Sequence, residues 1–300
     1  MTIDLRGLWV PLVTPFTPDD RVDTDALGRL ARRVLADGAR GLVALGTTGE
    51  PATLDPDEQQ RVIDVCAEAC AAAGAPLMVG AGTNSTRATV AAAQALAGVP
   101  GLAAVLTVVP YYTRPSPDAI VEHYRIVAAD SPVPVVAYNI PYRTGRGLDA
   151  EHLLALAALP GVVGVKQAVG ALDADTLTVL GGAPAGFHVL SGDDAFIVPT
   201  VLMGGHGAIA AAAHVCTPAF VAMEAAARAG DVGTARRLAD ALLPVVQAGF
   251  AEPSPAVWKA ALHATGEIAS PALRAPMAAA SPAALRHLLD AIDAMSATAR

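Results

Sequence analysis

Short apolar runs alternate with longer amphipathic stretches along most of the chain. Eight of the runs are apolar on both faces, which is typical of strands buried in a parallel sheet. They cover residues 8–13, 41–45, 76–79, 103–109, 133–137, 162–165, 187–190 and 207–211. Their starts lie about 20–35 residues apart, which leaves room for a strand and a crossover helix. The pattern therefore predicts eight parallel strands joined by helices.

The segments between the runs have helical spacing and starts typical of N-caps, such as Ser116 before Pro117 and also Asp149. These segments cover residues 24–37, 57–73, 86–97, 117–129, 149–158, 171–180 and 193–203. Right-handed crossovers can close eight such units into a (β/α)8 TIM barrel. An open, doubly wound sheet is built from similar units. The single series of eight evenly spaced units favours the barrel.

About ninety residues follow the last run, more than the one helix that a minimal barrel needs. Helical patterns punctuated by prolines cover residues 218–229, 234–249, 255–266 and 282–297. We therefore expect an α/β fold with a (β/α)8 barrel over residues 1–230. A C-terminal helical extension over residues 231–300 should pack on the barrel, because no clear linker separates the two.

Composition and charge exclude several classes of protein. Charged residues make up 16% of the chain and hydrophobic residues 53%, which excludes a disordered chain. The formal net charge is −8, and without a basic run the chain is a poor nucleic-acid binder. The longest apolar region, 89–110, is interrupted by glycine and proline, so we interpret it as helix, turn and strand rather than a membrane span. No signal peptide is indicated at the N-terminus.

Three cysteines, Cys66, Cys70 and Cys216, form an odd and sparse set that fits a reducing compartment better than a disulfide scaffold. We therefore expect a cytoplasmic protein with no membrane or nucleic-acid partner. Cys66 and Cys70 are four residues apart on a predicted helix, a spacing that could bind a metal ion. Because no second cysteine or histidine pair accompanies them, we interpret them as core residues.

Polar and small residues follow the predicted strands, at the end of a barrel where active sites lie. They occupy residues 14–16, 46–50, 80–84, 110–112, 138–139, 166 and 191–194. Lys166 stands out because lysines are few, the next being Lys259, and because a buried lysine is costly. Desolvation lowers its pKa, and a neutral amine can form a Schiff base with a ketone. The alternative is a lysine whose head reaches solvent.

Other strand ends carry groups that suit the same chemistry. Tyr138 could relay protons or could be a core tyrosine. Thr47 and Thr48 lie in a glycine-flanked turn whose N–H groups suit a carboxylate, or serve only the turn. Arg143 could bind a carboxylate in a bidentate manner or be solvated. Nucleotide-binding glycine motifs and histidine metal motifs are absent from the sequence, so it indicates neither a nucleotide nor a metal cofactor.

Six motifs together resemble the dihydrodipicolinate synthase and N-acetylneuraminate lyase family. They are Gly46-Thr-Thr-Gly-Glu50, Pro110-Tyr-Tyr-Thr-Arg-Pro-Ser116, Tyr138-Asn-Ile-Pro141 with Arg143-Thr-Gly145, Gly164-Val-Lys166, Ser191-Gly-Asp-Asp194 and Gly204-Gly-His-Gly-Ala-Ile209. They stand in the family's order and spacing over residues 6–280. The resemblance implies a class I Schiff-base enzyme on a TIM barrel with a C-terminal helical extension, without a metal or organic cofactor. It also implies a homotetramer built from tight dimers.

The resemblance also implies a role for individual residues. Lys166 would form an imine with pyruvate, and Tyr138 would shuttle protons. Thr47 would belong to the proton relay, and Thr48 would lie near the pyruvate carboxylate. Tyr112 would complete the relay in the neighbouring subunit's site. The remaining positions line the pyruvate pocket through their backbone, namely Gly192 and Ile209.

Two groups of residues bear on the identity of the second substrate. Arg143 before Thr-Gly resembles the synthase branch of the family, where this arginine holds the carboxylate of aspartate semialdehyde. Residues 167–171 and 210–213 depart from that branch, and polar groups near the second-substrate pocket give way to apolar ones. An aldolase or dehydratase acting on a 2-keto-3-deoxy sugar acid or another aldehyde adduct is therefore the alternative. A non-catalytic relative is the remote one, because the catalytic side chains are all present.

Two positions bear on feedback control. Pro56 and Ala88 stand where lysine-inhibited members of the family carry a histidine and a glutamate. An amine effector without its carboxylate partner loses a charge-assisted bond worth about 1.5–3 kcal/mol. We therefore predict weak or no inhibition by lysine.

Overall fold

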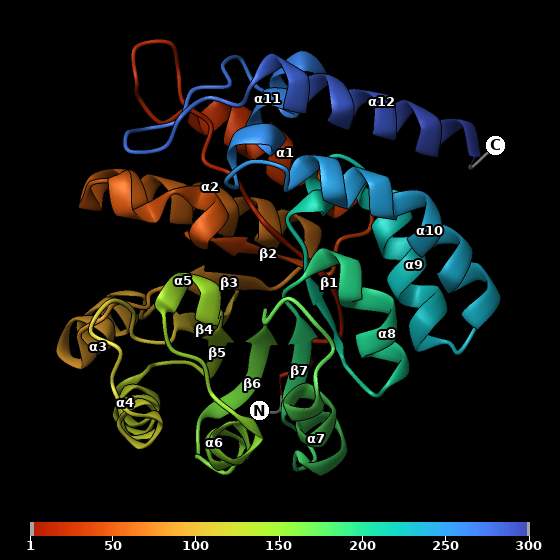
Figure 1. Cartoon of the computed structure of the whole chain (residues 1–300). Helices are drawn as coiled ribbons and strands as arrows, with labels where there is room; N and C mark the ends of the chain where they lie inside the picture. Colours follow the sequence, from red (N-terminus) through yellow and green to blue (C-terminus); the bar gives the residue numbers. More distant parts are fainter. Residues whose placement is uncertain (1–2, 299–300) are drawn as a thin grey trace.

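A computed structural model describes residues 3–298 and confirms the barrel. Eight parallel strands follow one another around a closed sheet, and β8 pairs with β1 (Figure 1). An open, doubly wound sheet is excluded because its edge strands would have no such partner. The strands are β1 (Gly7–Pro11), β2 (Gly41–Ala44), β3 (Leu77–Gly80), β4 (Leu102–Val108), β5 (Val135–Asn139), β6 (Val162–Gln167), β7 (His188–Ser191) and β8 (Gly207–Ile209).

Helices after each strand cover the outside of the barrel. They are α1 (Thr24–Ala36), α2 (Pro56–Ala73), α3 (Thr86–Ala95), α4 (Pro117–Asp130), α6 (Ala150–Ala157), α7 (Ala174–Gly182), α8 (Ile197–Leu202) and α9 (Thr217–Arg228). Their starts follow from local chemistry: Asp55 and Glu58 form a capping box around Pro56, and Ser116 and Asp149 cap α4 and α6 as expected.

Short helical segments lie just after several strands. They are η1 (Thr47–Gly49), η2 (Pro51–Thr53), α5 (Pro141–Thr144), η3 (Asp194–Phe196) and η4 (Ala212–His214). The sequence pattern predicts loops at four of the five and places the fifth, at 194–196, inside the longer helix expected over 193–203. Such single turns are too short for a hydrophobic period to reveal them. They matter because they carry Thr47, Thr48, Arg143 and Asp194 at this end of the barrel.

Among the described residues, three helices follow α9 and form the C-terminal extension, along the right and the top of Figure 1: α10 (Val232–Gly249), α11 (Ala256–Ala264) and α12 (Pro282–Thr298). Helix α10 packs against α9 and α12, and α11 contacts α12 and η4. A Cβ on Gly249 would lie 1.7 Å from Trp258, so only glycine permits this approach of the α11 tryptophan to the end of α10. No helix within residues 3–298 is long and apolar enough to cross a membrane.

The barrel interior is filled by side chains from alternate strand positions, as the pleat requires. One buried cluster groups Trp9, Val43, Met78, Ala104, Leu106, Val136, Leu190 and Ile209 with Tyr138. On β5, Tyr138 follows Val136 by two residues and therefore points to the same side. The apolar interior of the barrel therefore adjoins the polar groups at the carboxyl ends of the strands.

The three cysteines are buried and free, as expected for core residues. Burial raises the pKa of the Cys70 and Cys216 thiols to about 11, so both stay protonated at neutral pH. No group of three or more metal-ligating side chains occurs in the described part of the chain.

Candidate active site at the carboxyl ends of the strands

Lys166 and Tyr138 are direct partners across the β5–β6 pair. The Lys166 ammonium nitrogen lies 4.2 Å from the centroid of the Tyr138 ring. Their exposed fractions are 7% and 6%, so the lysine head does not reach solvent. The structure thereby rejects a solvated Lys166 and places an amine and a phenol together in the top layer of the barrel.

Burial lowers the pKa of Lys166 to about 8. The nearby carboxylates of Asp194 and Asp193 oppose this change, whereas the Arg143 guanidinium adds to it. A lysine with this pKa supplies a neutral amine at neutral pH far more often than an ordinary one. The chain's other lysine, Lys259, is also buried, so this protein of two lysines has neither on its surface.

The Tyr138 phenol is held in its protonated form. Burial raises its pKa well above the usual value, and the charges of Asp193 and Asp194 act in the same direction. Arg143 and a side-chain hydrogen bond with Thr47 oppose the rise. The phenol therefore has a hydroxyl neighbour to exchange protons with, which is the arrangement that a proton relay needs.

The turn after β2 places Thr47 and Thr48 differently. Thr48 is buried, whereas Thr47 is exposed in the single chain. Both belong to η1, whose first backbone N–H groups have no acceptor within the helix and so suit a carboxylate. The structure brings this turn to Tyr138 through the Thr47 hydroxyl.

Gly192 lies against the stem of Lys166. A Cβ at this position would lie 2.7 Å from the Ala168 Cβ and 3.0 Å from the Lys166 Cγ. Its N–H donates to the Gln167 carbonyl at 2.7 Å, which continues the β6–β7 ladder beyond β7. Ile209 closes the interior from β8 with an exposed fraction of 1%. Both therefore lie in the barrel's upper interior, and a side chain at 192 would press on the stem of Lys166.

Two acids after β7 are a part of the site to which sequence reasoning assigned no role. An Asp194 carboxylate oxygen accepts from the Ala212 N–H at 2.6 Å, and one of Asp193 accepts from the Gly170 N–H at 2.7 Å. Burial raises the pKa of Asp194 to about 7 and also raises that of Asp193. The signal that could have revealed them is a pair of consecutive acids directly at a strand end.

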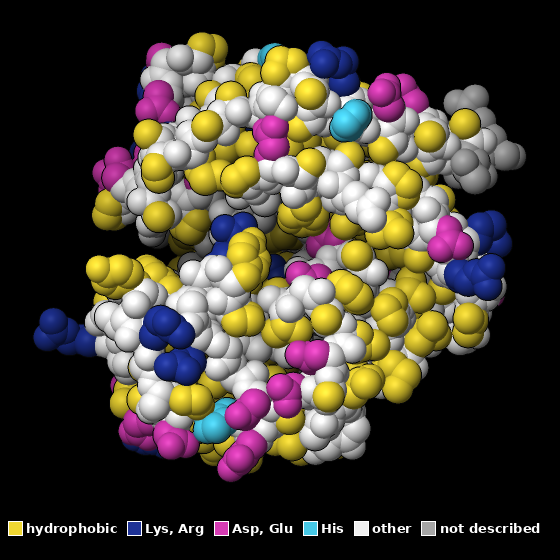
Figure 2. All heavy atoms as spheres, viewed as in Figure 1, with side chains coloured by type: hydrophobic (Ala, Val, Ile, Leu, Met, Phe, Trp, Pro, Cys, Tyr) yellow, Lys and Arg dark blue, Asp and Glu magenta, His cyan; other side chains and the backbone are white. Residues whose placement is uncertain are grey.

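Arg143 stands at the rim, on the short helix α5. Its side chain is exposed, and its guanidinium carbon lies 4.9 Å from the centroid of the Tyr142 ring. Its charge still affects the pKa values of Lys166 and Tyr138. Figure 2 shows a hollow near the centre of this face, with basic and acidic side chains beside it. An exposed guanidinium at such a rim can bind an incoming carboxylate.

Tyr112 is not buried against this site within one chain. Its side chain is 86% exposed, and its backbone is left-handed with a φ of 72°. Non-glycine residues persist in this conformation only where the surroundings fix it, and such residues cluster at functional sites. Its role in a neighbouring subunit stays a prediction.

Gln167 differs from its expected place. The sequence pattern groups it with the altered residues near the second-substrate pocket, but its amide lies on the outer face of the sheet. Its oxygen accepts from Asn139 at 3.0 Å, and its nitrogen donates to Thr176 at 3.1 Å. The cause is the strand period of two, which sends Gln167 to the face opposite Lys166. Of the changes after Lys166, only those at 169 and 171 remain candidates for the pocket.

Comparison with known proteins shows what this chain is related to. A model of the dihydrodipicolinate synthetase family matches residues 4–295. The 4-hydroxy-tetrahydrodipicolinate synthase of Moorella thermoacetica is 42% identical over 275 residues, which cover 90% of this chain and 91% of that protein. The chain belongs to the dihydrodipicolinate synthetase family.

Other members of the dihydrodipicolinate synthetase family support the same placement. The 4-hydroxy-tetrahydrodipicolinate synthase of Neisseria meningitidis serogroup C is 39% identical over 91% of this chain and 92% of its own length. A crystal structure of the dihydrodipicolinate synthase from Acinetobacter baumannii in complex with pyruvate has a TM-score of 0.93 at 30% identity. It covers 97% of this chain and 99% of that one.

Proposed function

We propose that this chain condenses pyruvate with aspartate semialdehyde to 4-hydroxy-tetrahydrodipicolinate through a Schiff base on Lys166. The observation that carries the proposal is the buried amine of Lys166, paired with the Tyr138 phenol at the carboxyl ends of the strands. Named relatives with about two fifths of their residues in common support the same reaction.

The first half of the reaction makes an imine. The neutral Lys166 amine attacks the keto carbon of pyruvate, and loss of water leaves a C=N bond. Tyr138 donates and accepts the protons of this step, with Thr47 as the next hydroxyl of the relay. The carboxylate of pyruvate lies at the turn of Thr48, and its carbon skeleton lies beside Gly192. No metal or organic cofactor takes part.

The second half forms the carbon–carbon bond. Loss of a methyl proton through Tyr138 converts the imine to an enamine, which attacks the aldehyde carbon of the second substrate. Arg143 binds that substrate's carboxylate at the rim. The substrate's own amine then attacks the imine carbon, closes the ring and releases Lys166. In this scheme the Tyr112 hydroxyl of a neighbouring subunit completes the relay, so we propose a homotetramer of tight dimers, acting in the cytoplasm.

A second candidate differs only in the aldehyde. Val169 and the buried alanines 210–213 make the surroundings of the strand ends less polar than the synthase pattern requires. A pocket that forms fewer hydrogen bonds suits a different partner, because such bonds decide between substrates. An aldolase or dehydratase of 2-keto-3-deoxy sugar acids would use Lys166 in the same way.

Borohydride trapping with intact mass measurement tests the proposal. The wild type should gain one reduced pyruvate, and Lys166→Ala should gain none. Tyr138→Phe should form the adduct more slowly, whereas Tyr142→Phe, at an exposed tyrosine of the short helix α5 that follows β5, serves as the matched control. A coupled assay then compares aspartate semialdehyde with other aldehydes. An adduct that persists in Lys166→Ala refutes the Schiff-base assignment, and turnover only with another aldehyde refutes the proposed substrate.

A further inference from the structure

The second lysine of the chain reaches the active-site turn from the C-terminal extension. Lys259 belongs to α11 and is fully buried. Its ammonium donates to a carboxylate oxygen of Glu50 at 2.8 Å and to the Thr14 carbonyl at 2.9 Å. It also lies 4.1 Å from the centroid of the Phe16 ring. A lysine so enclosed is held in one place by its partners.

Glu50 is the residue that ends the turn of Thr47 and Thr48. Its backbone is left-handed with a φ of 54°, and Leu45 on the other side of the turn has a φ of 53°. The Glu50 N–H donates to the Thr47 carbonyl at 3.2 Å. Two strained residues therefore bracket the turn, and such strain persists only where the surrounding structure fixes it.

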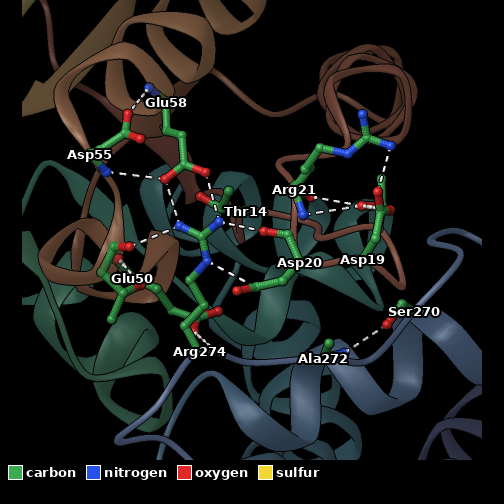
Figure 3. A network of polar contacts seen from close by, with 12 residues as sticks. Thr14, Asp19, Asp20, Arg21, Glu50, Asp55, Glu58, Ser270, Ala272 and Arg274 are labelled. Atoms are coloured by element: carbon green, nitrogen blue, oxygen red, sulfur yellow. Dashed lines mark hydrogen bonds and ion pairs between the residues drawn. The ribbon is translucent and has the colours of Figure 1, made fainter.

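The Glu50 carboxylate is fixed from both sides. Its second oxygen accepts from the Arg274 N–H at 3.1 Å, in the segment that follows α11. The Arg274 guanidinium in turn pairs with both oxygens of Glu58 at the start of α2 and with Asp20, as Figure 3 shows. Thr14 adds a bond to the same turn, because its hydroxyl donates to the Gly49 carbonyl at 2.7 Å.

We infer that Lys259 is a positioning residue for the Thr47–Thr48 turn, acting through Glu50. The extension would then do more than cover the barrel, because it fixes the hydroxyl that faces Tyr138. This inference rests on the proposed roles of Thr47 and Tyr138. Lys259 touches no reacting atom in this scheme, so its loss should act through the geometry of the turn and the charge left on Glu50.

The experiment compares four variants in the full chain: Lys259→Met, Glu50→Gln, the double variant of the two, and one control. Lys259→Met removes the ammonium and leaves a buried carboxylate with one main-chain donor. The double variant Lys259→Met/Glu50→Gln removes the stranded charge as well. Glu267→Gln is the matched control, because Glu267 forms another ion pair between the extension and the barrel, with Arg33 at 2.9 Å. Its loss should lower the unfolding temperature only.

Two readouts need pyruvate alone. One is the exchange of its methyl protons with deuterium, which reports proton removal through Tyr138 and Thr47. The other is the rate of imine trapping at saturating pyruvate. For Lys259→Met we expect at least a tenfold loss in both at pH 8, relative to wild type. The loss should shrink toward pH 6, because a stranded buried carboxylate takes up a proton readily. In the double variant, the exchange and trapping rates relative to wild type should not change with pH.

The outcomes separate the possibilities. If Lys259→Met is folded by circular dichroism and exchanges pyruvate protons like Glu267→Gln, the pair only stabilises the fold and the inference is overturned. If Lys259→Met does not fold, Glu50→Gln and the double variant decide instead: wild-type exchange in both overturns the inference, and a tenfold loss in Glu50→Gln supports it. A wild type that forms no pyruvate adduct overturns the proposed function, and the inference with it.

Discussion

The pH dependence of imine formation follows directly from the burial of Lys166. Its pKa is lowered from the ordinary 10.5 to about 8. At pH 7, roughly one molecule in ten then carries the neutral amine, about 300 times more than at the ordinary value. This difference corresponds to about 3 kcal/mol in the cost of deprotonation. The trapping rate should therefore rise about tenfold per pH unit below pH 8 and level off above it.

Trapping reactions at saturating pyruvate, quenched at set times between pH 6 and 10, measure this profile. Intact mass measurement gives the fraction of the protein that carries the adduct. An inflection near 10, or a rate independent of pH, would refute the idea that desolvation activates the amine. Asp194→Asn sharpens the test, because the Asp194 carboxylate raises the Lys166 pKa. The amide retains an oxygen for the Ala212 N–H, so the inflection should move below 8. Asp173→Asn, at the cap of α7, should leave it in place.

Two further predictions concern the pocket, and a third concerns feedback control. Gly192→Ala should slow imine trapping roughly 100-fold, because the new methyl group displaces the reacting lysine. Gly181→Ala, with open space around it, should trap pyruvate at the wild-type rate. Equal trapping rates in the two variants would contradict the steric argument. Arg143→Ala should form the pyruvate adduct but lose about 10- to 100-fold in kcat/KM for aspartate semialdehyde, as expected for a lost charge-assisted bond. An unchanged kcat/KM would show that Arg143 does not bind this substrate. Free lysine should inhibit turnover weakly or not at all, and a submillimolar inhibition constant would contradict this.

The strands and their closure could be predicted because a doubly buried strand is apolar at every position. The residues at which the strands end could not be predicted in this way. The run at 162–165 stops before Lys166, yet β6 continues to Gln167, and β5 continues to Asn139. The ladder depends on backbone bonds rather than on polarity. On the outer face, the Asn139 amide donates to the Gln167 side chain, and other partners take the remaining groups of the two amides. The apolar runs that predict the strands therefore stop at the polar residues of the candidate site, although the strands themselves continue.

The site was predictable only in part, for a related reason. Lys166 and Tyr138 could be named because each follows an apolar run, and the register then places them side by side. The helix expected at 193–203 begins only at Ile197, because the carboxylates of Asp193 and Asp194 bind backbone N–H groups of other loops. The contact between Glu50 and Lys259 spans 209 residues, and no local pattern carries that information.

A protein whose two lysines are both buried presents arginine as its only strongly basic side chain on the surface. Amine-directed crosslinkers, dyes and coupling resins should therefore find no lysine amine on the folded surface, and subunit contacts are better captured through carboxyl or tyrosine chemistry. Trypsin would meet a single cleavage point between Arg146 and Arg228, at Lys166. Reductive alkylation of that lysine blocks the cut, so a digest of the protein reports the occupancy of its own active site.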